Sequence, residues 1–272
     1  MTTSCDAGMK ALEDWPAAEL RGIRGVLTDI DDTLTTHGRF SSGVLSALER
    51  LRQSGLRLIA VTGRPTYWAQ PLLRLCDFDA VIAENGASAF WLDDRGVQQA
   101  WFYADASTRM LHRHALESLA MRLRDRFPVI SVAADAPQRV GDLTFDIGEQ
   151  VAPLAQSLVD EAAAFVRAEG FFATSSSIHL HASVVEFSKQ ATTRRILAEV
   201  FGVNDDDARR DYVFIGDSGN DATMFAHYPL TIGVANVARH LSRLSKPPAY
   251  VAGQAYGAGF VEAAQAILRA RI

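Results

Sequence analysis

Short apolar runs alternate with segments of helical periodicity along the first third of the chain. In order, three runs and the two helical segments between them occupy residues 24–30, 41–55, 56–63, 65–76 and 79–85. Within the first helical segment Val44, Leu45, Leu48 and Leu51 fall at helical spacing, and Gly55 follows its end. The runs are apolar throughout, which predicts strands buried on both faces. This part of the chain therefore predicts a βαβαβ unit with a parallel sheet covered by helices.

The same alternation returns near the end of the chain, at residues 210–221, 229–236, 249–253 and 259–272. Between the two halves the pattern changes to a hairpin, a helix, two strands, a second helix and two further strands. In order, these occupy residues 87–104, 106–127, 129–133, 143–148, 153–170, 171–177 and 178–188. Such a succession is typical of an antiparallel α+β layer. The sequence thus predicts an α/β, Rossmann-like parallel-sheet core formed by residues 1–87 and 187–272, with an inserted α+β cap domain over residues 88–186.

Composition narrows the classes of protein. The 272 residues are 48% hydrophobic, enough for a sizeable core, and the net charge is −5 with both signs interspersed, so no basic face is available for nucleic acid or anionic lipid. No apolar run approaches the roughly 20 residues that span a bilayer, and the first residues lack the pattern of a signal peptide. We therefore predict a cytoplasmic protein without a nucleic-acid or membrane partner. The two cysteines, Cys5 and Cys76, predict neither a disulfide framework nor a metal cluster.

Polar residues gather where the predicted core strands end. They are Asp29, Asp31 and Asp32 after the first strand, Thr62, Gly63 and Arg64 after the second, and Asp217 and Asp221 after the run YVFIG. The carboxyl ends of parallel strands lie at one edge of the sheet, where ligands bind. Several carboxylates meeting there cannot all stay ionised without a cation, and carboxylate oxygens are ligands that Mg²⁺ prefers. The sequence therefore predicts a Mg²⁺ site at this edge.

Four motifs in this order resemble those of the haloacid dehalogenase-like (HAD) superfamily: DIDDT from Asp29, VTGR at residues 61–64, a lysine at 189 that opens a helix, and GDSGND at residues 216–221. The stretch IAENGA at residues 82–87 and the long insert are similar to the C2B-capped, type IIB branch, which includes Cof-like hydrolases, sucrose- and trehalose-phosphate phosphatases and phosphomannomutase. The resemblance covers essentially the whole chain. It implies the HAD fold with a C2B cap and a phosphatase activity.

The resemblance also implies a role for each motif residue. Asp29 would attack phosphorus to form an aspartyl-phosphate, and Asp31 would protonate the leaving oxygen and then deprotonate water. Thr62 and Lys189 would hold the phosphoryl oxygens. Asp217 would complete the Mg²⁺ site together with the Asp29 carboxylate and the backbone carbonyl of Asp31.

Further residues are expected around that centre. Gly63, Arg64 and Asn220 would contact the substrate, although a role for Arg64 in stabilising a helix start stays open. Asp221 would orient metal-bound waters or the lysine. The family commonly has glycine where this chain has Asp32, a change that would adjust the geometry of the turn.

Cap residues offer the clue to specificity. Ser176, Ser177 and His179 would reach toward the leaving group of the substrate, and His179 and His181 share one face of a predicted strand. A strand that faces solvent stays open as the alternative. The aromatic residues between positions 91 and 103 are predicted to form cap core or a partner surface.

The expected substrate is a small phosphorylated metabolite, and the resemblance favours a sugar phosphate. Two alternatives stay open: a phosphomutase of the same fold, and a non-catalytic sugar-phosphate-binding protein. The pair Asp29 and Asp31 argues against the second, because a binding protein would not need both. A homo-oligomer is equally open.

Overall fold

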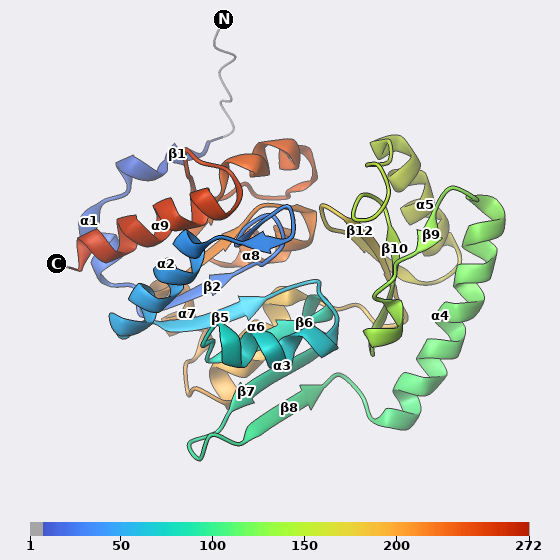
Figure 1. Cartoon of the computed structure of the whole chain (residues 1–272), viewed down its shortest axis with the longest axis horizontal. Helices are drawn as coiled ribbons and strands as arrows, with labels where there is room; N and C mark the ends of the chain where they lie inside the picture. The colour runs from blue at the N-terminus through green and yellow to red at the C-terminus, as the bar shows by residue number, and fades with distance from the viewer. Residues whose placement is uncertain (1–7, 272) are drawn as a thin grey trace, which may run out of the picture.

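The structure, a computed structural model, describes residues 8–271. Figure 1 shows two lobes, a larger one built from both ends of the chain and a smaller one built from its middle. Cys5 lies outside the described residues, and Cys76 is partly buried against the apolar core of the larger lobe. None of the helices described between residues 8 and 271 is both long and apolar enough to cross a bilayer.

A sheet of nine strands runs through the larger lobe of the described chain. In spatial order the strands are β1 (Lys10–Ala11), β15 (Tyr250–Val251), β14 (Thr231–Gly233), β13 (Tyr212–Gly216), β2 (Gly25–Thr28), β5 (Arg57–Val61), β6 (Ala80–Ala83), β7 (Ser88–Leu92) and β8 (Gln98–Phe102). Neighbours from β1 to β6 pair in parallel. Successive residues of β5 enter opposite apolar clusters, Leu58 and Ala60 on one face and Ile59 and Val61 on the other. The prediction of a parallel sheet buried on both faces is confirmed.

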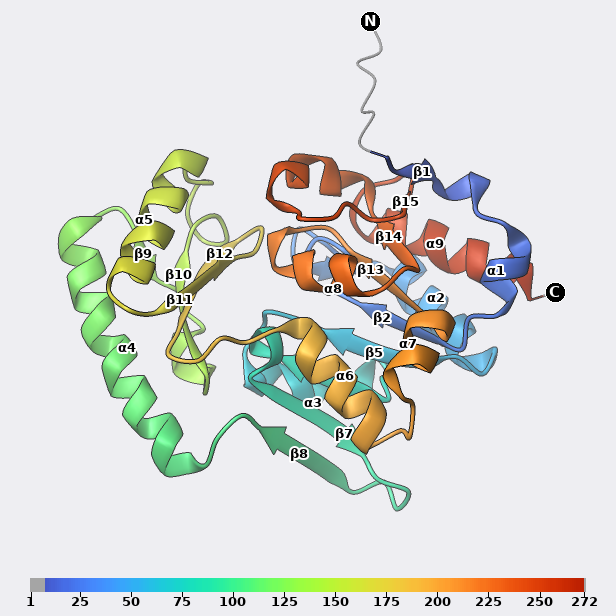
Figure 2. The ribbon, with the colours of Figure 1, turned by 180° about the vertical axis from the view of Figure 1, so that it is seen from behind.

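Helices cover both faces of this sheet. One layer, in front in Figure 1, contains α1 (Ala17–Arg21), α2 (Ser42–Gln53), α3 (Thr66–Leu75) and α9 (Tyr256–Ala270). The other, in front in Figure 2, contains α6 (Lys189–Glu199), α7 (Asp205–Asp211) and α8 (Ala222–His227). Helix α2 shows how the sequence sets its limits: the Ser41 side chain accepts a hydrogen bond from the Val44 N–H, and Gly55 follows with φ 80°.

The hairpin of β7 and β8 extends the large sheet, so its prediction as part of the cap is wrong. Strand β7 pairs antiparallel with β6, with Ala80 opposite Trp91, and Trp91 and Trp101 pack against the apolar cluster beneath α6, α7 and α8. Without the hairpin, β6 would be an edge strand with unpaired backbone groups. The cap therefore begins near Asp105, whose side chain caps α4 (Ala106–Arg126).

The cap contains an antiparallel sheet of four strands in the order β11 (Phe172–Ser175), β12 (His179–Ser183), β10 (Asp142–Asp146) and β9 (Ser131–Val132). Helices α4 and α5 (Gln156–Ala168) cover one face, where Leu143 and Leu180 join their apolar side chains in a common cluster. The other face is polar and turned toward the larger lobe (Figure 1). Because side chains alternate between faces of a strand, Asp142, His179 and His181 all lie on that polar face. The predicted α+β layer is confirmed from α4 onward.

Candidate active site

Asp29, Thr62 and Asp217 follow neighbouring parallel strands at their carboxyl ends. They come directly after β2, β5 and β13. The Asp29 N–H donates to the carbonyl of Ile215 in β13 at 2.9 Å. This hydrogen bond holds the loop after β2 beside the end of β13. Carboxylate oxygens of Asp29, Asp217 and Asp221 lie within 4.8 Å of one another, and all three residues are buried. The structure thus brings these predicted residues to one edge of the sheet.

Asp32 shapes the turn that carries the first aspartates. Its backbone is left-handed, with φ 57°, a region that glycine enters freely and that Asp and Asn tolerate better than most residues. The Asp32 N–H donates to Thr35 Oγ1 at 3.2 Å, and the Asp32 carbonyl accepts from Asn236 at 3.0 Å. The chain then enters the small hairpin of β3 (Thr35–Thr36) and β4 (Arg39–Phe40). The left-handed turn explains why glycine suits this position.

Lys189 lies at the start of α6, with its ammonium group between two carboxylates. Its Nζ is 2.6 Å from Asp29 Oδ1 and 2.7 Å from Asp221 Oδ1, and the side chain is completely buried. Burial lowers the pKa of Lys189, but the Asp221 and Asp29 carboxylates outweigh it and raise the pKa above its ordinary value. The lysine is therefore a fixed positive charge beside Asp29.

Asp221 holds both this lysine and the loop after β13. Its Oδ2 accepts from the N–H groups of Asp217 and Ser218 at 3.0 and 3.1 Å, while Oδ1 faces Lys189. Both carboxylate oxygens are thus engaged by protein donors. This geometry suits the predicted orienting role.

The carboxylates of Asp29 and Asp217 carry more negative charge than Lys189 offsets. Burial raises the pKa of Asp29 to about 8, and burial together with the neighbouring Asp29 raises the pKa of Asp217. Asp217 is held in place by Asn236, which donates to Oδ2 at 2.8 Å, and by Thr33 at 3.4 Å from Oδ1. A buried set of oxygen ligands with excess negative charge fits a hard divalent cation such as Mg²⁺.

Asp31 faces away from that cluster, toward the guanidinium group of Arg64. Arg64 Nε donates to both Asp31 oxygens, at 3.0 and 2.8 Å, and Nη2 donates to Oδ1 at 2.6 Å. The remaining nitrogen, Nη1, donates to Glu149 of the cap at 2.6 Å, and Glu149 Oε2 lies 2.9 Å from His179 Nε2. Arg64 therefore links the predicted acid–base residue to the cap.

Thr62 and Gly63 directly follow β5 at its carboxyl end. Thr62 is buried, and its Oγ1 accepts from the Arg64 N–H at 3.0 Å. A Cβ atom added to Gly63 would lie 3.2 Å from His181 Cε1 and 3.3 Å from both Asn220 Nδ2 and Asn85 Oδ1. A side chain at position 63 would therefore crowd residues of both lobes.

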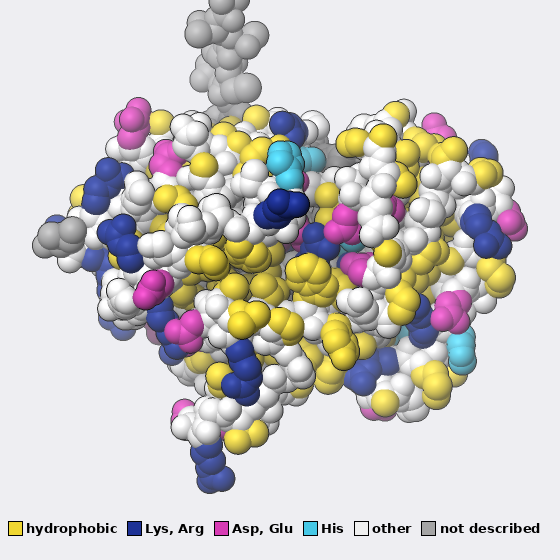
Figure 3. Space-filling view, in the orientation of Figure 1, with side chains coloured by type: hydrophobic (Ala, Val, Ile, Leu, Met, Phe, Trp, Pro, Cys, Tyr) yellow, Lys and Arg dark blue, Asp and Glu magenta, His cyan; other side chains and the backbone are white. Residues whose placement is uncertain are grey.

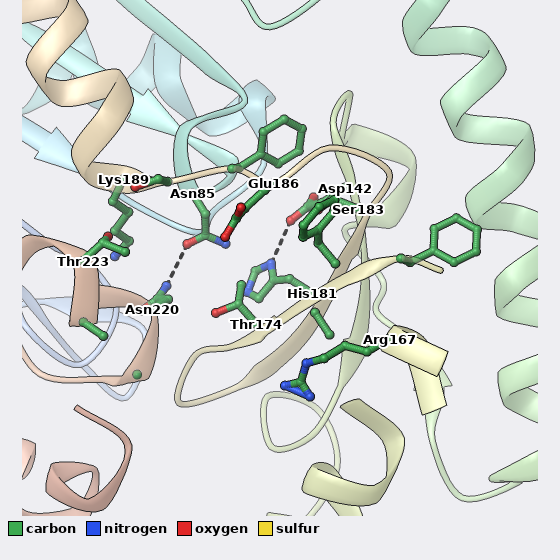
Figure 4. A pocket seen from close by; sticks show the side chains of 17 residues that line it. Asn85, Asp142, Arg167, Thr174, His181, Ser183, Glu186, Lys189, Asn220 and Thr223 are labelled. Atoms are coloured by element: carbon green, nitrogen blue, oxygen red, sulfur yellow. Dashed lines mark hydrogen bonds and ion pairs between the residues drawn. The ribbon is translucent and has the colours of Figure 1, made fainter. Parts of the chain in front are cut away.

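Two of the cavities between the lobes share His181 and Asn220 in their linings. A small one of about 10 Å³, close to the volume that admits one water, is lined by the catalytic loops and the cap strand turn: Asp29, Asp31, Gly63, Arg64, Ser176, Ser177, Ile178, His179, His181, Ser218 and Asn220. A larger one of about 490 Å³ shares His181 and Asn220 with it and reaches Arg167 and Phe172 of the cap (Figure 4). The structure thus places Ser176 and His179 beside Asp29 and Asp31, and His179 is 2% exposed rather than facing solvent.

Sequence reasoning missed the residues that join the two lobes. The buried carboxylate of Glu84 accepts from the N–H groups of Val140 and Gly141, the latter at 2.7 Å, and Arg139 Nη1 donates to the Gly63 carbonyl at 2.9 Å. A charged residue directly after the apolar run AVIA was a usable signal for Glu84. Arg139 stands in an irregular segment without a periodic pattern, so the sequence carried no comparable signal for it.

The fold and this site define a class of protein. A sequence profile of haloacid dehalogenase-like hydrolases matches residues 26–110, the part of the chain that includes Asp29 to Arg64. The phosphoglycolate phosphatase of Pyrobaculum neutrophilum is 30% identical over 251 residues, which cover 91% of this chain and 96% of that protein. The chain therefore belongs to the haloacid dehalogenase-like hydrolase family and is a phosphatase.

Further relatives agree with this placement. The phosphoglycolate phosphatase of Methanospirillum hungatei is 25% identical over 88% of this chain and 94% of that protein. A solved protein of Thermoplasma acidophilum has a TM-score of 0.65 at 20% identity, covering 91% of this chain and 98% of that chain. The sucrose-phosphatase of a Synechocystis species, solved with sucrose and phosphate, has a TM-score of 0.61 at 16% identity over 90% and 98%. These two structures share the fold.

Proposed function

We propose that this protein is a Mg²⁺-dependent phosphomonoesterase that releases phosphate from a small phosphorylated metabolite through an aspartyl-phosphate on Asp29. The observation that carries the proposal is the surroundings of Asp29. Its carboxylate lies 2.6 Å from the Lys189 ammonium group and within 4.8 Å of the Asp217 and Asp221 oxygens, at the bottom of a cleft covered by the cap. A buried carboxylate with a fixed cation beside it suits attack on an anionic phosphate.

The metal would be held by the carboxylates of Asp29 and Asp217 and the backbone carbonyl of Asp31. When bound, Mg²⁺ supplies positive charge that offsets the repulsion between the anionic nucleophile and the anionic substrate. Asp221 keeps Lys189 and the Asp217 loop in position through the three contacts described above.

The reaction then runs in two steps on this chain's own residues. An Asp29 oxygen forms a bond to phosphorus while the bond from phosphorus to the leaving oxygen breaks, and Asp31 gives its proton to that oxygen. Water then attacks phosphorus, Asp31 takes a proton from the water, and Asp29 is released with inorganic phosphate. Lys189 and Thr62 hold the phosphoryl oxygens in both steps. Substrate entry opens the pair between Asp31 and Arg64 and widens the small cavity, which is smaller than a phosphoryl group.

Two substrate classes have support. The relatives of 25% and 30% identity are phosphoglycolate phosphatases, which favours phosphoglycolate. The larger cavity of about 490 Å³ exceeds what that small anion needs, and hydroxyl and imidazole groups of Thr174, Ser183 and His181 line it. Those groups suit a sugar phosphate.

The test is release of inorganic phosphate, with Mg²⁺ and with a chelator, from phosphoglycolate, a panel of sugar phosphates and an aryl phosphate. We expect turnover with Mg²⁺ that Asp29→Asn abolishes. Sugar phosphate isomers formed without release of phosphate would instead indicate the phosphomutase. Tight binding of a sugar phosphate with no turnover of any compound would indicate the binding protein and end the proposal.

A further inference from the structure

Two buried side-chain nitrogens that line the larger cavity have no hydrogen-bond partner among the described residues, Asn85 Nδ2 and His181 Nε2. His181 is 3% exposed, and among the residues that the structure describes none forms a hydrogen bond with its Nε2. Leaving a buried polar atom unpaired destabilises the folded protein. His181 lines both the small cavity beside Asp29 and the larger cavity beneath the cap sheet. An unsatisfied atom at this place points to a ligand group that it binds.

The other ring nitrogen of His181 is held by a charged pair. His181 Nδ1 lies 2.8 Å from Asp142 Oδ2, and Arg139 Nη1 lies 3.0 and 3.3 Å from the two Asp142 oxygens. Burial raises the pKa of Asp142, but Arg139 and His181 outweigh it and lower the pKa to about 2. Asp142 is therefore ionised and can only accept, so the proton on His181 Nδ1 is the one shared between them.

The contact with Asp142 determines whether His181 Nε2 donates or accepts a hydrogen bond. With the proton on Nδ1, the neutral ring carries a lone pair at Nε2 and no hydrogen. Burial lowers the pKa of His181 more than Asp142 raises it, which favours the neutral ring. The ring of His179, at 5.9 Å between centroids, and the guanidinium group of Arg139 add no acceptor for a second proton. Nε2 is therefore a hydrogen-bond acceptor aimed at the site.

The ring also has a fixed position relative to the catalytic loops. A Cβ atom added to Gly63 would lie only 3.2 Å from His181 Cε1, the ring carbon bonded to Nε2. The ring therefore lies against the loop that carries Thr62. Figure 4 shows the His181 ring between Asp142 of the cap and the core residues Asn85 and Asn220, which hydrogen-bond to each other at 2.9 Å. A group attached to a phosphate at Asp29 would pass this ring on its way into the larger cavity.

We propose that His181 Nε2, oriented by Asp142, accepts a hydrogen bond from a hydroxyl group of the leaving group and thereby selects hydroxylated phosphomonoesters over carboxylated ones. The inference deepens the proposed function and rests on it. A hydroxyl group donates to the lone pair, whereas a carboxylate has only acceptors and would face the lone pair without a proton between them. Phosphoglycolate is therefore the disfavoured class, and polyol or sugar phosphates are the favoured one.

A matched set of small esters isolates this contact. Hydroxyethyl phosphate and phosphoglycolate differ only in a hydroxymethyl group against a carboxylate, and ethyl phosphate has neither. With Mg²⁺ we expect kcat/KM in the order hydroxyethyl, ethyl, phosphoglycolate, with at least about a tenfold step between the first two. A bound water on Nε2 instead of substrate would leave hydroxyethyl and ethyl phosphate equal, and preference for phosphoglycolate would overturn the proposal.

Variants of His181 and Asp142 test the proton placement. His181→Phe keeps a ring without an acceptor, so the ratio of hydroxyethyl to ethyl phosphate should fall to near one, whereas His114→Phe on the exposed part of α4 should keep the wild-type ratio. In Asp142→Asn the amide oxygen faces Arg139 and the amide NH₂ donates to Nδ1, which moves the ring proton to Nε2. That variant should gain preference for phosphoglycolate, a change that mere loss of packing would not produce.

A spectroscopic measurement completes the test in the intact protein. The ¹⁵N NMR signals of His181, assigned by their loss in His181→Phe, should report a proton on Nδ1 in the wild type and on Nε2 in Asp142→Asn. A proton on Nε2 in the wild type would overturn the proposal whatever the kinetics. Failure of the wild type to hydrolyse even an activated aryl phosphate would refute the proposed function itself, while hydrolysis with the opposite ester order refutes only the role of His181.

Discussion

The carboxylates of the core and those of the cap stand in opposite electrostatic situations. In the core, Asp29 shares Lys189 with Asp221, Asp217 lies beside them, and burial raises the pKa of Asp29 and of Asp217. In the cap, the His179 contact and the Arg64 charge lower the pKa of Glu149 to about 2, and Arg139 keeps Asp142 at about 2. Glu149 and Asp142 therefore each have a positively charged partner within the folded chain. The core set has one ammonium group, Lys189, beside three carboxylates, which is the physical reason to expect a cation there and not in the cap.

Charged and apolar side chains occupy different parts of the surface. In Figure 3 the two lobes meet at a seam where dark blue and magenta side chains lie close together, while yellow side chains cover much of the face around α2 and α3. Arg64, which binds Asp31 on one side and Glu149 on the other, belongs to both sets. The difference teaches that paired charges join the lobes, whereas the proposed reacting centre holds more negative than positive charge.

The largest effect is expected from Asp29, the proposed nucleophile. Asp29→Asn removes the attacking carboxylate and should lower phosphate release by at least about 10³-fold. Asp32→Asn makes the same chemical change three residues further on, where Asn also tolerates the left-handed backbone, and it should change the rate by less than about threefold. Equal losses in the two variants would mean that general charge, not the nucleophile, governs the rate.

The next effect concerns the only ammonium group that pairs with Asp29 in the described chain. Lys189→Met leaves Asp29 and Asp221 buried without it and should lower the free energy of unfolding by about 3–5 kcal/mol at neutral pH. Adding Asp29→Asn to Lys189→Met should recover part of the lost free energy of unfolding, because one buried charge is removed. Urea denaturation of the wild type, the two single variants and the double variant measures the coupling between the two residues. Strictly additive losses would show that Lys189 does not stabilise Asp29.

The pH dependence of stability should separate the two sets. Without metal, the raised pKa of Asp29 means that the folded state binds its proton more tightly, so this contribution is complete below 3.8 and is lost as the pH rises toward about 8. The lowered pKa values of Glu149 and Asp142 act in reverse: their contribution is present above about pH 4.5 and is lost as the pH falls toward about 2.

Thermal melting of chelator-treated protein across this range, with and without Mg²⁺, is the measurement. Mg²⁺ should raise the melting temperature more at about pH 8 than at about pH 5, because protons compete with the metal for the same carboxylates. At saturation near 100 times its Kd the metal should add about 2.7 kcal/mol. A Mg²⁺ effect that does not depend on pH would contradict binding at Asp29 and Asp217.

The smallest effect is expected where the lobes join. Glu84→Gln places an amide NH₂ against the N–H groups of Val140 and Gly141 and should cost about 1–3 kcal/mol. Amide hydrogen exchange at these two residues should become faster, while Glu117→Gln on the exposed face of α4 leaves it unchanged. Unchanged exchange in Glu84→Gln would show that this contact does not hold the cap.

The core of the fold was predictable because its strands are buried on both faces and its helices are capped by local signals such as Ser41 and Gly55. The positions of Asp29, Thr62 and Asp217 followed from the rule that parallel strands end at one edge. The place of β7 and β8 was not predictable in the same way. Their alternating pattern fits an edge of either sheet, and only the pairing of Ala80 with Trp91 decides between them.

The sequence by itself determined the parallel core, the inserted cap and the loops that carry the aspartates, because these depend on periodicity and turn residues close together in the chain. Tertiary structure alone decided which charges meet. The Arg64 guanidinium group lies between Asp31 and Glu149, and the His181 ring lies against Asp142, 39 residues away in the chain. Contacts between residues far apart in the chain depend on how the two lobes pack together. No local sequence pattern specifies that packing.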